Sequence, residues 1–96
     1  MSPELYQLHA FLEKIKNKNV PQIIEACFSK LRALEVSPSP DNNLAENLKS
    51  VVMLLKHLHR PSGMPPEIAE YLRRFLTEVM EKDRRAKHAL EVLGKE

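Results

Sequence analysis

The positions of the prolines constrain the fold of this chain most strongly. Six of the seven prolines stand in or just before a segment whose apolar residues have helical spacing: Pro3, Pro21, Pro38, Pro40, Pro65 and Pro66. Proline is tolerated in the first turn of a helix, but in the interior it removes a hydrogen bond and clashes with the preceding turn. No segment shows the two-residue alternation of a strand. We therefore expect an all-α fold, a compact bundle of four to five helices with a long C-terminal helix.

Capping residues and apolar stripes locate the first two helices. Ser2, followed by a proline and a glutamate, is typical of a helix start, and apolar residues at helical spacing continue to Ile15. Asn19 can cap a second helix, whose apolar stripe runs to Leu34. The Ser-Pro-Ser-Pro sequence at residues 37–40 ends that helix, because a residue that precedes a proline is pushed out of the helical region.

The middle of the chain predicts two further helices. Ser39 or Asp41 can cap a short third helix around residues 42–45. A fourth helix then extends from Leu48 to Leu58 and is apolar on more than one face. Such a helix is typical of the centre of a bundle.

The last third of the chain predicts a helix that is too long for a small domain. A continuous helix over residues 65–93 would measure about 43 Å at about 1.5 Å per residue, and its apolar stripe stops across residues 81–85. We expect a single domain over residues 1–96, a module of a larger protein, with its core at about 4–80. Residues 81–96 form a helical extension that projects, frays or bends back. The extension offers three apolar residues to a second copy of the chain: Leu90, Val92 and Leu93.

The charge of the chain is too balanced to indicate nucleic acid. Fifteen basic and thirteen acidic residues give a net charge of +2. Basic residues on the later helices favour a solvated surface over a direct contact with nucleic acid, although a weak phosphate-binding face stays an alternative: Arg73, Arg74, Arg84, Arg85 and Lys87. No apolar run reaches the length of a membrane span, so we expect no membrane partner.

No residue pattern indicates catalysis or a cofactor. His57 and His59 are two residues apart, a spacing that turns them to different sides of a helix, and two further zinc ligands are missing. Cys27, the single cysteine, lies on an apolar stripe, where a buried thiol is inert. The chain has two glycines, too few for a phosphate-cradling loop. We predict a protein that is not an enzyme and has no metal site and no cofactor.

We predict that the binding residues lie in two inter-helix loops, because functional residues are often found on loops that rigid helices hold in place. The first loop is Lys16, Asn17, Lys18, Asn19 and Val20, and the second loop is Arg60, Pro61, Ser62, Gly63 and Met64. We expect the bundle to present the two loops side by side. Val20 and Met64 either form an exposed apolar contact for a peptide or staple the following helices to the core.

Two segments resemble a known family. Residues 31–37, LRALEVS, resemble the end of the second helix of TFIIS N-terminal-like domains, and residues 51–60, VVMLLKHLHR, are similar to an apolar helix of that family that closes with basic residues. Leu8-His9-Ala10 matches the start of the family's first helix. The resemblance is closest to the integrase-binding domain of lens epithelium-derived growth factor and its hepatoma-derived growth factor relatives, and it covers roughly residues 4–80.

The resemblance implies a nuclear scaffold that binds short disordered motifs of transcription elongation or chromatin factors. In the integrase-binding branch the two loops make the contact. Asn17 falls where that branch has a key acidic residue, and Pro61 is nearest to the position of its aromatic residue. A basic rim, Lys56 to Arg60, would then attract an acidic peptide. The alternative is a self-assembly domain, a monomer or weak dimer that pairs through its C-terminal helix.

Overall fold

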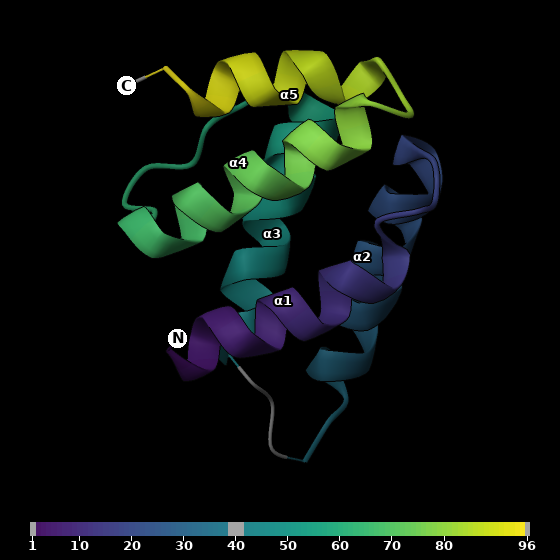
Figure 1. The fold of residues 1–96 in the computed structure, drawn as a ribbon. Coiled ribbons are helices and arrows are strands. Elements are labelled where there is room, and N and C mark those ends of the chain that lie inside the picture. The colour runs from purple at the N-terminus through teal and green to yellow at the C-terminus, as the bar shows by residue number, and fades with distance from the viewer. Residues whose placement is uncertain (1, 39–41, 96) are drawn as a thin grey trace.

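Five helices follow one another in the computed structural model, which describes residues 2–38 and 42–95 (Figure 1). They are α1 (Pro3–Ile15), α2 (Val20–Glu35), α3 (Asn42–His57), α4 (Pro66–Met80) and α5 (Arg85–Leu93). No strand occurs in these two ranges. The predicted all-α bundle is therefore confirmed.

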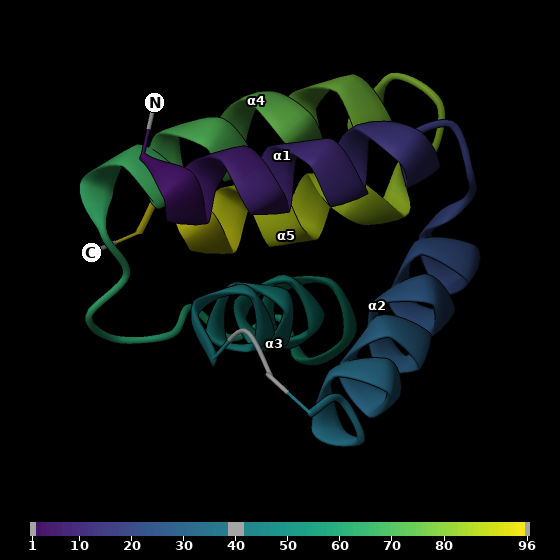
Figure 2. The same ribbon diagram turned by 90° about the horizontal axis from the view of Figure 1, so that it is seen from below.

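The helices form two layers (Figure 2). α1, α4 and α5 lie together in one layer, and α2 lies beside α3 in the other. α3 packs against α1, α2 and α5, so it is the central helix of the bundle. α1 and α4 run in the same direction: the Ser2 hydroxyl donates to Glu67 Oε1 at 2.5 Å where both helices begin, and Lys82 donates to Asn17 just after both have ended.

The predicted helix starts at Ser2 and Asn19 are confirmed by their capping hydrogen bonds. The Ser2 hydroxyl accepts from the backbone N–H of Leu5 at 3.2 Å. Asn19 and Gln22 form a reciprocal capping box, in which each side chain accepts from the other residue's backbone N–H. The predicted caps at Ser39 and Asp41 lie outside the described residues.

The middle of the chain differs from the prediction. The two helices expected over residues 42–45 and 48–58 are one helix, α3. That helix ends at His57, so Leu58 is outside it, 47% exposed and with a φ of 52°. The other predicted apolar positions of this helix do face the core, as Leu48 and Leu54 are almost fully buried.

The expected long C-terminal helix is broken. Residues 81–84 separate α4 from α5, and α5 turns back onto α3 and α4. A straight helix of about 43 Å would exceed the longest dimension of the molecule, 37 Å. Ala86, Ala89 and Leu93 are buried, so the core extends to Leu93 and does not end near residue 80. Leu90 and Val92 are partly buried against this core and do not project away from it.

No helix of the described residues combines the length and the apolar character needed to cross a bilayer.

Candidate functional site

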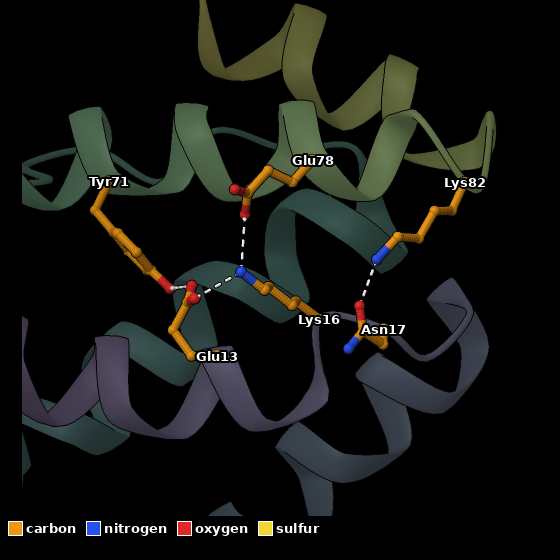
Figure 3. Close-up of polar contacts among 6 residues, drawn as sticks. All are labelled: Glu13, Lys16, Asn17, Tyr71, Glu78 and Lys82. Atoms are coloured by element: carbon orange, nitrogen blue, oxygen red, sulfur yellow. Dashed lines mark hydrogen bonds and ion pairs between the residues drawn. The ribbon is translucent and has the colours of Figure 1, made fainter.

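The start of the first loop is tied to α4 by an ionic network (Figure 3). The Lys16 ammonium lies 2.8 Å from Glu13 Oε1 and 3.5 Å from Glu78 Oε2. The other oxygen of Glu13 accepts from the Tyr71 hydroxyl at 3.0 Å. Lys16, which is predicted to bind a partner, is therefore already paired with two carboxylates of the same chain.

The rest of the first loop is similarly engaged. The Asn17 amide oxygen accepts from Lys82 (Figure 3), and Asn19 caps α2. The backbone N–H of Val20 donates to Asp83 Oδ2 at 3.0 Å. Lys18 is exposed, and its side chain makes no polar contact with any residue that the structure describes. Of the five predicted residues, Lys18 alone presents an uncommitted side chain.

The Tyr71 network borders a small cavity between α1 and α4, of about 220 Å³, which His9, Arg74 and Glu78 also line. The hydrogen bond from Lys16 lowers the pKa of Glu13 and raises the pKa of Lys16. Burial, with the bond to Glu13, raises the pKa of Tyr71. Each shift holds its group in its ordinary neutral-pH charge state, which suits a structural clamp rather than proton transfer near pH 7.

The second loop lies at the other end of α4. Arg60 Nε donates to the carbonyl of Leu93 at 3.0 Å, at the negative end of the α5 dipole. Gly63 has a φ of 75°, a left-handed conformation that glycine adopts without strain. Residues 61–64 line one side of a cavity of about 360 Å³.

This second cavity, the acidic cavity, is open to solvent and is bordered on its other sides by the first turns of α1 and α4 and by α3. Among the residues that the structure describes, its charged lining residues are Glu4, Glu46 and Glu67, and no lysine, arginine or histidine lines it. Asn43, Asn47 and Ser50 of α3 complete its polar wall. The predicted second loop thus faces negative charge, which opposes the expected attraction of an acidic peptide at this place.

The structure does not bring the two predicted loops together. The first loop lies beside the C-terminal end of α4, and the second loop precedes its N-terminal end, so the length of α4 separates them (Figures 1 and 2). For 15 residues that length is about 22 Å. The expectation of one site built from both loops is wrong in its geometry.

The apolar residues of the two loops face inward. Val20 is 2% exposed, and Met64 is partly buried against the core. Of the two roles considered for them, stapling the following helix to the core is the one that the packing favours.

A groove between α2 and α3, the α2–α3 groove, was missed in the sequence. It has a volume of about 480 Å³, and its apolar lining consists of Phe28, Leu31, Leu34 and Ala45. In the sequence these α2 residues continue the stripe of buried Cys27 and are indistinguishable from core. α2 packs mainly on α3, and after Cys27 none of its residues is fully buried.

Cations dominate the rim of the α2–α3 groove. Among the described residues, Arg32 and Lys49 line it together with a single carboxylate, Glu35, and Arg32 also lies 3.5 Å from Glu25 outside the groove lining. The Lys56 ammonium lies 5.1 Å from the centre of the Phe28 ring, a cation–π distance. The rim therefore favours a ligand with negative charge around apolar anchors.

The residues considered for metal binding or nucleophilic chemistry are not assembled into a site. His57 and His59 are exposed, the first in the last turn of α3 and the second beyond it. Among the described residues no three His, Cys, Asp or Glu side chains are grouped so that they could hold a metal ion. Cys27 is fully buried, and burial raises the pKa of its thiol to about 12. That thiol stays protonated at neutral pH.

No family model, curated protein or solved structure matches this chain.

Proposed function

We propose that this chain is a protein-interaction module that binds a short acidic amphipathic segment of a partner in the α2–α3 groove. The observation that carries the proposal is the uncovered apolar stripe on the C-terminal half of α2. Phe28, Leu31 and Leu34 pack against the core on one side only and open onto the groove. An amphipathic helix that lays its apolar face in such a groove is a common mode of peptide recognition.

Charge selects the partner within this mode. Arg32 and Lys49 line the groove, the Lys56 ammonium lies over the ring of Phe28, and Glu35 is the one carboxylate among the described lining residues. Acidic residues beside apolar anchors would pair with these cations and raise the rate of association. A few buried anchors would supply most of the binding energy.

The resemblance to TFIIS N-terminal-like domains supports a partner among transcription elongation or chromatin factors, and thus a nuclear role. Four groove residues belong to the first segment that carries the resemblance, and Lys56 of the second segment lies over the ring of the groove residue Phe28; the four are Leu31, Arg32, Leu34 and Glu35. The proposed site differs from the two loops that the resemblance implies.

Chemical-shift mapping of the ¹⁵N-labelled chain with a synthetic acidic amphipathic peptide tests the proposal. We expect saturable shifts in residues 28–35 and 45–56, and weaker binding at high salt. Lys49→Glu reverses a rim charge without touching the core and should weaken binding several-fold, whereas Lys87→Glu, a matched change at an exposed position of α5, should leave it unchanged.

Shifts confined to the two loops, or equal affinity of the Lys49→Glu and Lys87→Glu variants, would overturn the groove as the site. Sedimentation of the chain without peptide distinguishes the alternative occupant. Concentration-dependent association that Leu34→Ser abolishes would assign the groove to a second copy of the chain and refute an acidic peptide as its partner.

A further inference from the structure

The acidic cavity contains a buried polar side chain without a partner. Asn47 is 9% exposed, and its amide makes no hydrogen bond with any residue in the described ranges. In those ranges, every side-chain nitrogen or oxygen atom that is fully shielded from solvent has a hydrogen-bond partner. The unpaired amide of Asn47 therefore retains some solvent-accessible surface, at the cavity that this residue lines.

An unpaired amide at such a position is a group that a ligand can satisfy. A buried amide without a hydrogen bond is less favourable than one that is paired. Solvent in the cavity relieves part of this cost, and a ligand that bonds the amide relieves it with better geometry. Asn47 thus fixes where a polar group of a ligand would lie.

The charges of the cavity decide the sign of that group. Glu4 and Glu67 each use one carboxylate oxygen in a bond with a neighbour, from Asn43 at 3.4 Å and from Ser2 at 2.5 Å. Their second oxygens and the carboxylate of Glu46 have no partner among the described residues. With three carboxylates and no cationic lining residue in the described part of the chain, the cavity favours a positive group.

We propose that the acidic cavity binds the side chain of a lysine or arginine from a partner peptide. Met64, Pro65 and Ile68 give the cavity apolar walls, against which the methylene stem of such a side chain can pack. The cationic head then donates to the carboxylates and to the Asn47 amide oxygen. A volume of about 360 Å³ accommodates one such side chain with water around its head.

This cavity and the α2–α3 groove lie on opposite sides of α3. Ala45 and Lys49 line the groove, whereas Asn47 and Ser50 line the cavity. At about 100° per residue, Ala45 and Asn47 point about 160° apart around the helix. The cation site therefore stands independently of the proposed groove, and one partner could occupy both only by wrapping around α3.

The test uses three short peptides that are otherwise uncharged and carry a single arginine, lysine or citrulline. Citrulline keeps the shape of arginine and removes its charge. We expect saturable shifts of the Asn47 side-chain amide and the Gly63 N–H with the two cationic peptides, and none with citrulline. Glu46→Gln should weaken binding about tenfold, the effect of one charged hydrogen bond, while Glu91→Gln at an exposed position of α5 should not.

Asn47→Leu supplies a second variant. It removes an unpaired buried amide, so the chain should fold at least as stably, yet cation binding should be lost. The proposal is overturned if the citrulline peptide binds equally well, if no saturable shift occurs, or if Glu46→Gln binds as the unchanged chain does. The groove variant Lys49→Glu serves as an internal reference: it should leave this binding intact, so that failure of one site is distinguished from failure of the other.

Discussion

The first and second loops use their polar groups in opposite ways. In the first loop Lys16, Asn17 and Asn19 all bond to side chains or backbone within the bundle, and the N–H of Val20 donates to Asp83. The second loop has one comparable tie, from Arg60 to the end of α5, and otherwise borders an open cavity.

This difference separates a loop that holds helices together from one that borders the proposed cation site. Donors and acceptors that are already paired in the free protein must break those bonds before they can bind a partner, at a cost that cancels most of the gain. The first loop is therefore a structural joint between the α1–α2 and α4–α5 corners. The acidic cavity beside the second loop retains unpaired oxygens and the Asn47 amide.

The largest expected effect on stability comes from α3, the central helix, which packs against α1 and α2 on either side of the first loop and leads into the second loop. Leu55 is 7% exposed, and Leu55→Ala should lower the free energy of unfolding by about 2–5 kcal/mol through lost burial and the cavity that it leaves. Urea denaturation measures the change. His57→Ala, an exposed position on the same helix, is the control, and it should change stability by less than about 0.5 kcal/mol.

Asp83 tests whether the first loop is a structural joint. Its two carboxylate oxygens accept from the N–H groups of Val20 and Arg85, each at 3.0 Å, and so join the starts of α2 and α5. Asp83→Ala should lower the free energy of unfolding by about 1–2 kcal/mol, since both bonds end on a charged group. Glu81→Ala removes a nearby exposed carboxylate as the control. Equal stability of the two variants would refute the joint.

The same joint predicts a weakening of the fold in acid. The bonds from Val20 and Arg85 lower the pKa of Asp83, and the bond from Lys16 lowers that of Glu13. Because both carboxyl groups have lower pKa values folded than unfolded, their stabilising contribution is complete above the ordinary carboxyl pKa of about 4 and is lost as the pH falls below it. Thermal denaturation between neutral pH and pH 2 should therefore show a falling Tm.

Asp83→Asn isolates the share of that effect that belongs to the joint. The asparagine cannot ionise, so the variant should be less stable at neutral pH and should lose less stability on acidification. The variant Glu81→Gln should retain the acid dependence of the unchanged chain. An identical pH profile for all three chains would contradict the role given to Asp83.

The sequence predicts the first loop's local structure better than its function. Ser2 and Asn19 are visible because a cap is made within one turn of the residue itself. The engagement of Lys16 with Glu78 is not visible, because it depends on α1 and α4 running in the same direction. The same directions separate the two loops, and no local pattern records them.

The two proposed binding surfaces are not visible in the sequence for a related reason. Phe28, Leu31 and Leu34 have the spacing of a buried stripe, and only the position of α2 at the side of the bundle leaves them uncovered. Asn47 is an ordinary polar residue in the sequence, and its isolation depends on which elements close the cavity. By contrast, the stop in the apolar pattern at residues 81–85 did mark the break before α5.

Leu58 provides the finest comparison, since it stands where α3 turns into the second loop. Its φ of 52° is a left-handed conformation that a Cβ atom disfavours by about 1–2 kcal/mol, and His59 N–H reaches back to the Met53 carbonyl at 3.0 Å across it. Leu58→Gly and Leu58→Ala both remove the leucine side chain beyond Cβ, and they differ only in whether the Cβ atom is present. The glycine variant should be the more stable by about 1 kcal/mol.

Gln7, an exposed residue inside α1, gives the matched pair for this measurement. There the order should reverse, with Gln7→Ala more stable than Gln7→Gly by about 1 kcal/mol, because alanine is the better helix former. Urea denaturation of the four variants compares the two differences directly. If alanine were also the more stable choice at residue 58, the turn that leads into the second loop would not require a left-handed residue. That result would contradict the left-handed conformation of Leu58 on which this prediction depends.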